Sequence, residues 1–192
     1  MQELKDRIVK EGKGLPGNII KVDGFLNHRI DTELMDHIAE EFGKHFNMDE
    51  VSLILTAEAS GIALSAIVAQ HFHKPMIFAK KAKSDNIEGG LYQSDIFSYT
   101  YKKKVTLLVS KEWMSADDKV LIIDDFMANG EAMRGLCDIV KAAGATLVGI
   151  GCAVEKGFQG GGDRLRAAGV NLKSLAIIES AEPGNIVFRD ED

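Results

Sequence analysis

The stretch that decides the fold spans residues 120–132 and reads VLIIDDFMANGEA. Its four leading apolar residues predict a short buried strand that Asp124 and Asp125 close. A turn at Gly130 follows, and apolar residues then recur at helical spacing over residues 131–143. A strand, an acidic turn and a helix in this order indicate one βα unit.

The same alternation of strands and helices continues on both sides of this unit. Short apolar runs predict strands at residues 51–56, 76–79, 119–123, 146–154, 174–178 and 186–188. Amphipathic patterns predict helices at residues 1–12, 32–46, 62–72 and 165–168, whereas residues 14–27 read as irregular. The pattern predicts an α/β fold with a central, mostly parallel sheet flanked by helices. In such sheets ligands bind beyond the carboxyl ends of the strands, here residues 56–61, 124–132 and 155–158.

Composition excludes several classes of protein. The 192 residues predict a single domain over 1–192, and a hydrophobic share of 45% excludes disorder. The 23 Lys and Arg against 29 Asp and Glu give a net charge of −6, which argues against a nucleic-acid or membrane-surface partner. Two cysteines, no signal-peptide pattern and no long apolar run lead us to expect a cytoplasmic protein.

The acidic pair and the turn after it carry the strongest chemical signal. Backbone N–H groups at a helix start bind anions, and Gly130 permits the close approach of a phosphate. Asp124 and Asp125 suit vicinal hydroxyls and a cationic transition state. The alternative is a strand end with one capping carboxylate and one solvated carboxylate.

Two further segments follow predicted strands. The small residues Ala59, Ser60 and Gly61 form a turn that lets the backbone approach an anion, and we expect a strained or cis peptide there; the alternative is an ordinary βα turn. Lys156 can donate to an exocyclic oxygen and Phe158 can stack on a purine, which favours a 6-oxo over a 6-amino base. The alternative for Lys156 is a surface lysine at a strand end.

Residues 120–132 resemble the binding motif for phosphoribosyl pyrophosphate (PRPP) of the type I phosphoribosyltransferases. The resemblance implies that Asp124 and Asp125 are catalytic, and that Mg²⁺ arrives with PRPP rather than in a metal site fixed by the protein. It implies that PRPP contacts five loop residues, namely Ala128, Asn129, Gly130, Glu131 and Ala132. The loop lacks the family's usual hydroxyl residues, so we expect backbone amides to bind the phosphate, with Asn129 as a side-chain donor, and Glu131 to point away. Ala59, Ser60 and Gly61 match the pyrophosphate loop.

Residues 21–31, KVDGFLNHRID, look closely like the N-terminal hood of the bacterial xanthine phosphoribosyltransferases. This resemblance implies a hood over about residues 1–30, a homodimer, and xanthine contacts from the backbone near Ile20 and from Asn27, Lys156 and Phe158. It implies a purine salvage enzyme that transfers the phosphoribosyl group of PRPP to xanthine, giving xanthosine 5′-monophosphate (XMP) and pyrophosphate.

A lysine-rich stretch over about residues 80–111 carries seven lysines against three acidic residues. Charge alone fits a solvated hairpin or a lid over a polyanion, and the resemblance favours a flexible lid. Three alternative functions stay open: a guanine or hypoxanthine phosphoribosyltransferase, a PRPP-sensing regulator of the same fold, and another α/β nucleotide-binding enzyme. The last lacks support, because no Gly-x-Gly-x-x-Gly or Walker A loop follows the first predicted strand of the sheet.

Overall fold

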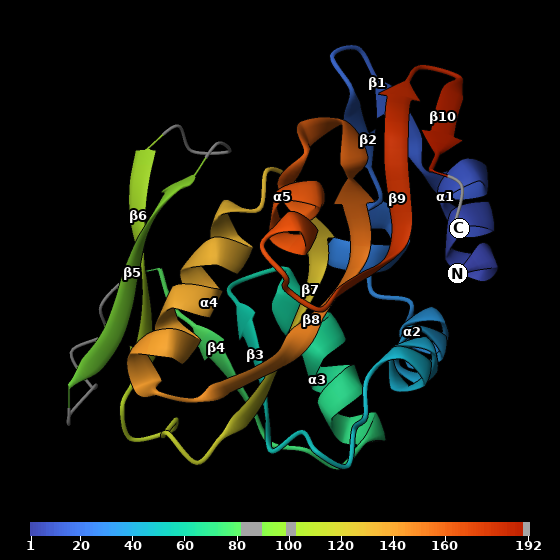
Figure 1. The fold of residues 1–192 in the computed structure, drawn as a ribbon. Coiled ribbons are helices and arrows are strands. Elements are labelled where there is room, and N and C mark those ends of the chain that lie inside the picture. The colour runs from blue at the N-terminus through green and yellow to red at the C-terminus, as the bar shows by residue number, and fades with distance from the viewer. Residues whose placement is uncertain (82–89, 99–102, 190–192) are drawn as a thin grey trace.

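The computed structural model describes residues 1–81, 90–98 and 103–189. Its centre is a six-stranded sheet of order β10-β9-β8-β7-β3-β4 (Figure 1). The strands are β3 (Leu53–Ala57), β4 (Met76–Ala79), β7 (Lys119–Met127), β8 (Thr146–Lys156), β9 (Leu172–Glu182) and β10 (Asn185–Phe188). All neighbours are parallel except the β9–β10 pair. The predicted α/β fold with a mostly parallel sheet is confirmed.

Helices cover both faces of the sheet and create two cores. Strand β7 alternates between them: Leu121 and Ile123 join the core beneath α1 (Gln2–Glu11), α2 (Thr32–His45) and α3 (Gly61–His71). Val120 and Ile122 join the core beneath α4 (Glu131–Ala143), with α5 (Gly161–Ala167) on the same side. This double burial explains why the strands read as continuous apolar runs. Within the described residues, no helix has the length and apolar character needed to span a bilayer.

The strand predicted over residues 119–123 is longer than expected. It continues through Asp124 and Asp125 to Met127, because β8 pairs with it as far as the Met127–Glu155 register. The acidic pair therefore belongs to the end of a paired strand, and β-sheet hydrogen bonds fix its backbone.

The segment predicted as irregular at residues 14–27 is in fact ordered into short elements. β1 (Lys13–Leu15) and β2 (Ile19–Lys21) pair antiparallel, and a π-helical turn, η1, spans Asp23–Asn27. Strands of three residues are too short to show a period, and tertiary contacts hold them: Gly14 lies against the β9 backbone, and Asn18 accepts a hydrogen bond from the Ala181 N–H. The Asp31 carboxylate caps α2 by accepting from the Leu34 N–H, as an N-cap does.

The described part of the predicted lid forms a hairpin. β5 (Leu91–Ser98) and β6 (Lys103–Ser110) pair antiparallel and lie outside α4 (Figure 1). Ile96 and Leu107 are buried in the α4 core. The remaining lid positions, 82–89 and 99–102, lie outside the described residues.

Gly135 lets α4 and the hairpin meet. A Cβ atom at this position would lie 2.5 Å from Ile96 Cγ2 and 3.0 Å from Leu107 Cδ1. We predict that Gly135→Ala lowers the free energy of unfolding by about 1–3 kcal/mol, because overpacking exceeds the ~1 kcal/mol gain in helix propensity. Urea unfolding measures this, with Lys141→Ala on the exposed side of α4 as the control. Unchanged or increased stability of Gly135→Ala would contradict the packing.

Candidate active site

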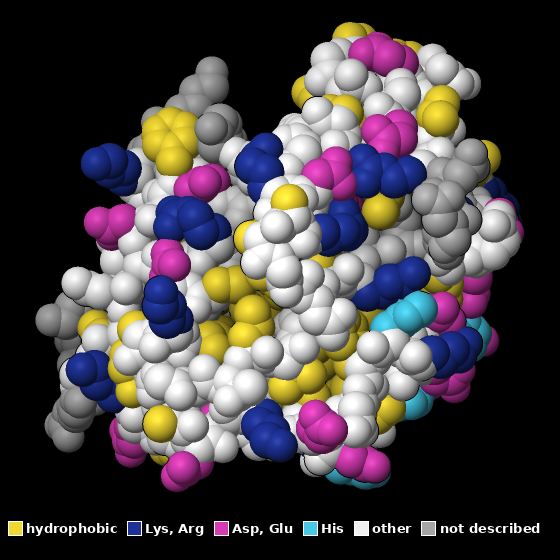
Figure 2. All heavy atoms as spheres, viewed as in Figure 1, with side chains coloured by type: hydrophobic (Ala, Val, Ile, Leu, Met, Phe, Trp, Pro, Cys, Tyr) yellow, Lys and Arg dark blue, Asp and Glu magenta, His cyan; other side chains and the backbone are white. Residues whose placement is uncertain are grey.

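A cavity of about 300 Å³ opens beyond the carboxyl ends of β3 and β7 and reaches the end of β8. Figure 2 shows the surface hollowed between the β5–β6 hairpin and the ends of β8 and β9, with Lys and Arg side chains beside the hollow. The predicted site residues that line the cavity are Ser60, Asp124, Asp125, Ala128, Asn129, Gly130, Glu131, Ala132 and Lys156. The fold thus joins all three segments that the sequence selected, since neighbouring parallel strands end at one edge.

The acidic pair is buried and tightly held. Asp124 is 7% exposed and Asp125 is 1% exposed. The Asp125 N–H donates to Asp124 Oδ1 at 3.0 Å, and the Ser60 hydroxyl donates to Asp125 Oδ1 at 2.8 Å. Asp125 Oδ2 has no hydrogen-bond partner within the described structure. One buried carboxylate oxygen of the pair therefore lacks a hydrogen-bond donor among the described residues.

Burial sets the electrostatics of this pair. It raises the pKa of Asp124 well above its ordinary value, and the charge of Asp125 raises this pKa further, whereas the Lys81 ammonium opposes the shift. The free protein therefore holds an acidic pair whose full ionisation is costly. A ligand with positive charge would stabilise that ionisation.

The turn after β7 has the geometry of a phosphate loop. Gly130 has a φ of 81°, in the left-handed region that glycine favours. The Asn129 side-chain oxygen accepts from the Glu131 N–H at 3.4 Å, so its amide NH₂ group is not used in that contact. The Glu131 carboxylate turns along α4 and pairs with Arg134 at 3.1 Å. A side chain of the first turn of α4 thus holds the Glu131 carboxylate, and Glu131 also lines the cavity.

The turn after β3 contains the expected unusual peptide, because the bond between Glu58 and Ala59 is cis. Ser60 lines the cavity, whereas Ala59 and Gly61 are outside its lining. Gly61 lies under the acidic pair, where a Cβ atom would come within 2.2 Å of Asp124 Oδ1. Glu58 accepts from the Lys81 N–H at 2.6 Å and joins the end of β4 to this turn.

The predicted base-reading residues are only partly brought together. Lys156 is half-buried at the cavity, and burial lowers its pKa. Its Nζ lies 5.3 Å from the centroid of the Phe126 ring, and the described residues offer it no ion pair. Phe158 packs against the core and Ile20 is buried in it, while Asn27 lies at the end of η1. None of these three lines the described cavity.

Several cavity residues lie within the segments that the sequence selected but were given no specific role there, among them Glu58, Lys81 and Phe126. Phe126 follows the acidic pair directly, and a strand extended past Asp125 would have indicated that its ring lies at the site. Glu58 and Lys81 lie 23 positions apart, and their contact depends on the pairing of β3 with β4. No local pattern reports such a contact.

A family model described as the phosphoribosyl transferase domain matches residues 25–168. The chain belongs to the phosphoribosyltransferase family. The matched range includes both turns at the cavity, the acidic pair and Lys156.

Curated members of the family are similar over the full length. A protein of Lachnoclostridium phytofermentans named xanthine phosphoribosyltransferase is 51% identical over 193 residues, which is 100% of both chains. One of Bifidobacterium longum with the same name is 52% identical over 98% of this chain and 100% of that protein.

Solved phosphoribosyltransferases share the fold. The enzyme of Giardia lamblia complexed with 9-deazaadenine has a TM-score of 0.76 at 20% identity, covering 91% of this chain and 96% of that chain. An adenine phosphoribosyltransferase from Trypanosoma brucei has a TM-score of 0.73 at 22% identity, covering 91% of this chain and 79% of that chain. At 20–22% identity these structures support the shared fold, but they do not indicate which base this protein uses.

Removing one buried charge tests the electrostatics of this phosphoribosyltransferase. We predict that Asp124→Asn raises the free energy of unfolding of the ligand-free protein at pH 8 by about 1 kcal/mol or more. The folded state binds the Asp124 proton more tightly than the unfolded state, so wild-type stability falls as pH rises. The advantage of the variant therefore shrinks at acidic pH, where wild-type Asp124 is also neutral.

Thermal unfolding across pH measures the effect, and 1 kcal/mol corresponds to about 2–4 °C in Tm. Asp117→Asn, at an exposed position, is the control and leaves Tm unchanged. A loss of stability in Asp124→Asn at pH 8 would contradict a strained charge.

Proposed function

We propose that the protein transfers the 5-phosphoribosyl group of PRPP to xanthine, giving XMP and pyrophosphate, in purine salvage. The observation that carries the proposal is the cavity where the buried acidic pair adjoins the phosphate loop and Lys156. Relatives about half identical over the full chain are named xanthine phosphoribosyltransferase, which supports this choice of base.

The acidic pair is proposed to act at the ribose. Asp124 and Asp125 accept hydrogen bonds from the ribose hydroxyls and stabilise the positive charge that develops at the anomeric carbon. The base nitrogen supplies the electron pair for a new bond to that carbon. At the same time the bond from that carbon to pyrophosphate breaks, and pyrophosphate leaves with the electron pair of the broken bond. The base proton goes to solvent. Burial raises the pKa of Asp124 in the free protein, and positive charge at the anomeric carbon would favour the ionised carboxylate.

The two turns are proposed to hold the ends of PRPP. Backbone N–H groups over Ala128, Asn129, Gly130, Glu131 and Ala132 bind the 5′-phosphate. The positive φ of Gly130 supports this assignment. The turn at Ala59, Ser60 and Gly61 contacts pyrophosphate, with Lys81 beside it as a cation. The stretch at residues 80–111 is proposed to close over the bound polyanion and exclude water.

Mg²⁺ is proposed to enter with PRPP. Oxygen donors suit this ion, and the carboxylate residues Glu58, Asp124 and Asp125 line the cavity beside the pyrophosphate turn. Among the described residues, no group of three or more His, Cys, Asp or Glu side chains is placed to hold a metal ion. The oxygens of PRPP would supply most ligands, and the ion would neutralise pyrophosphate as it leaves.

Base selection is proposed to rest on Lys156. Its ammonium, held over Phe126, donates to the 6-oxo group that xanthine, guanine and hypoxanthine share and that adenine lacks. Phe126 lines the cavity and is proposed to contact the base. Resemblance to the family supports further roles for the backbone near Ile20 and for Asn27 and Phe158 at the base.

We further propose that the enzyme is a cytoplasmic homodimer, on the strength of the family resemblance. Sedimentation equilibrium of the purified full chain at micromolar concentration tests the assembly. A single species at 20.9 kDa would contradict it.

A panel of bases tests the function. We predict that PRPP consumption is fastest with xanthine, slower with guanine and hypoxanthine, and negligible with adenine, because Lys156 cannot pair with an amino donor. Lys156→Met is expected to lower kcat/KM for xanthine by about 10²-fold, as expected for a lost charged hydrogen bond at a buried edge. Lys141→Met, on the exposed side of α4, is the control. Faster turnover of adenine would refute the base assignment.

Neutralising the acidic pair tests its role at the ribose. We predict that Asp124→Asn combined with Asp125→Asn lowers kcat by about 10²–10³-fold, the usual cost of losing electrostatic stabilisation of a transition state. Steady-state rates with saturating PRPP and xanthine measure this, and a circular dichroism melt confirms folding. Turnover near that of the wild type would remove both residues from the mechanism.

A further inference from the structure

Helix α5 touches the phosphate loop directly, and the contact depends on glycine. A Cβ atom at Gly161 would lie 2.5 Å from the carbonyl carbon of Asn129 and 2.6 Å from the Gly130 nitrogen. Real Cβ atoms do not approach backbone atoms so closely, so Gly161 is the residue that lets the helix rest on the loop. Residues 156–159, here called the base-reading segment because they contain Lys156 and Phe158, lie just before this helix, and η2 spans Gly157–Gln159.

Arg164 joins these two segments through one side chain. Its Nη2 donates to the Asn129 carbonyl at 2.9 Å, and its Nη1 donates to the Gln159 carbonyl at 3.4 Å. Asn129 belongs to the phosphate loop, and Gln159 lies three positions after Lys156. A guanidinium presents donors in a rigid fork, so one arginine can hold two carbonyls that a lysine ammonium cannot span.

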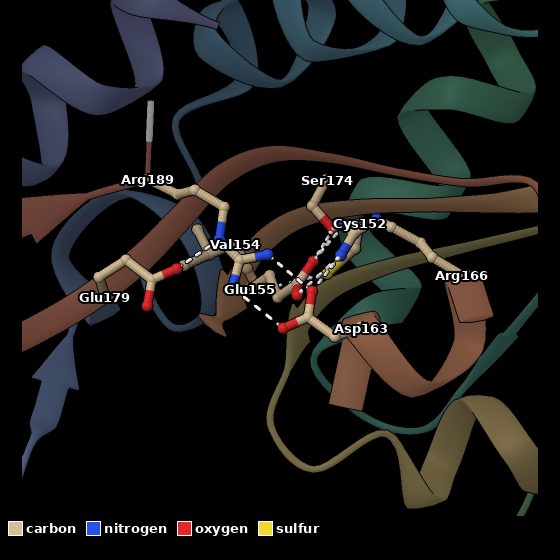
Figure 3. A network of polar contacts seen from close by, with 8 residues as sticks. All are labelled: Cys152, Val154, Glu155, Asp163, Arg166, Ser174, Glu179 and Arg189. Carbon is tan, nitrogen blue, oxygen red and sulfur yellow. Dashed lines mark hydrogen bonds and ion pairs between the residues drawn. The ribbon is translucent and has the colours of Figure 1, made fainter. Parts of the chain in front are cut away.

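A buried polar network anchors α5 on the opposite side (Figure 3). Glu155 is fully buried and accepts from Arg166 Nη2 at 2.6 Å and from the Ser174 hydroxyl at 2.5 Å. A Cβ atom at Gly162 would lie 2.1 Å from Glu155 Oε1, so the helix start lies directly against this carboxylate. Because Glu155 and Lys156 are adjacent on β8, the strand that presents the base-reading lysine also fixes the helix that carries Arg164.

We propose that Arg164 is a positioning residue that couples the phosphate loop to the base-reading segment. The inference rests on the proposed function, which places the two ends of one nucleotide at these segments. A ligand that orders one segment then lowers the ordering cost of the other, because Arg164 hydrogen-bonds to both and the anchored helix holds Arg164 in place. The phosphate loop has no hydroxyl side chains to bind the phosphate, so binding depends on the position of its backbone amides. The Arg164 contact to the Asn129 carbonyl helps to fix that position.

Two ligands separate coupling from simple charge attraction. XMP reaches both segments, whereas ribose 5-phosphate reaches the phosphate loop alone. We expect Arg164→Met to weaken XMP binding about tenfold and ribose 5-phosphate binding less than about threefold, by isothermal titration calorimetry. Arg164→Lys keeps the charge, so we expect it to restore ribose 5-phosphate affinity while XMP stays weakened. Lys141→Met is the control and leaves both affinities unchanged.

The outcomes are distinguishable. Equal weakening of the two ligands by Arg164→Met, or full recovery of XMP affinity in Arg164→Lys, would overturn coupling and leave Arg164 as a charge near the phosphate. Unchanged XMP affinity in Arg164→Met would also overturn it. If the wild-type protein forms no XMP from xanthine and PRPP, the proposed function itself fails, and that result is read from the base panel without any Arg164 variant.

Discussion

Asp124 and Asp125 lie next to each other at the end of β7 and are almost fully withdrawn from solvent. Water stabilises two such charges far better than a protein interior does. Local contacts offset part of the cost: the Ser60 hydroxyl donates to one carboxylate, and the Lys81 charge opposes the raised pKa of the other. The remaining imbalance favours a ligand with positive character at the site. The rest of the cavity is arranged around this constraint.

The parallel sheet brings the other groups to the acidic pair. Strands β3, β7 and β8 are neighbours, so the turns after β3 and β7 and the end of β8 meet at one edge. The pairing of Met127 with Glu155 sets the register, and it leaves Lys156 one residue beyond, at the cavity. A slip of one residue would exchange the places of Glu155 and Lys156, because successive side chains point to opposite faces. The buried network around Glu155 therefore also protects the position of Lys156.

The site's periphery depends on close packing that only glycine allows. Gly135 lets α4 pack against side chains of the hairpin, and Gly161 lets α5 pack against the backbone of the phosphate loop. Gly135 contacts Ile96 and Leu107, which lie about 30–40 positions earlier in the chain. Gly161 contacts the loop at residues 128–130, and α4 and β8 lie between them in sequence. These contacts explain why glycines that lie within helices matter here as much as the glycine in the phosphate loop.

By itself, the sequence determined the α/β class, the chain order of the central-sheet strands and of the helices around them, and the acidic pair with its glycine turn, because these depend on local periodicity and turn chemistry. It also placed Lys156 near the carboxyl end of a strand of the sheet, and the structure makes it the last residue of β8. Only the tertiary structure decided that β7 runs on to Met127, that Phe126 lines the cavity, and that Arg164 spans two loops. The physical reason is that these features depend on contacts with distant parts of the same chain. The length of a strand depends on the neighbouring strand, and the placement of a ring or a carbonyl contact depends on residues across the cavity. No local window of the sequence contains both sides of such a contact.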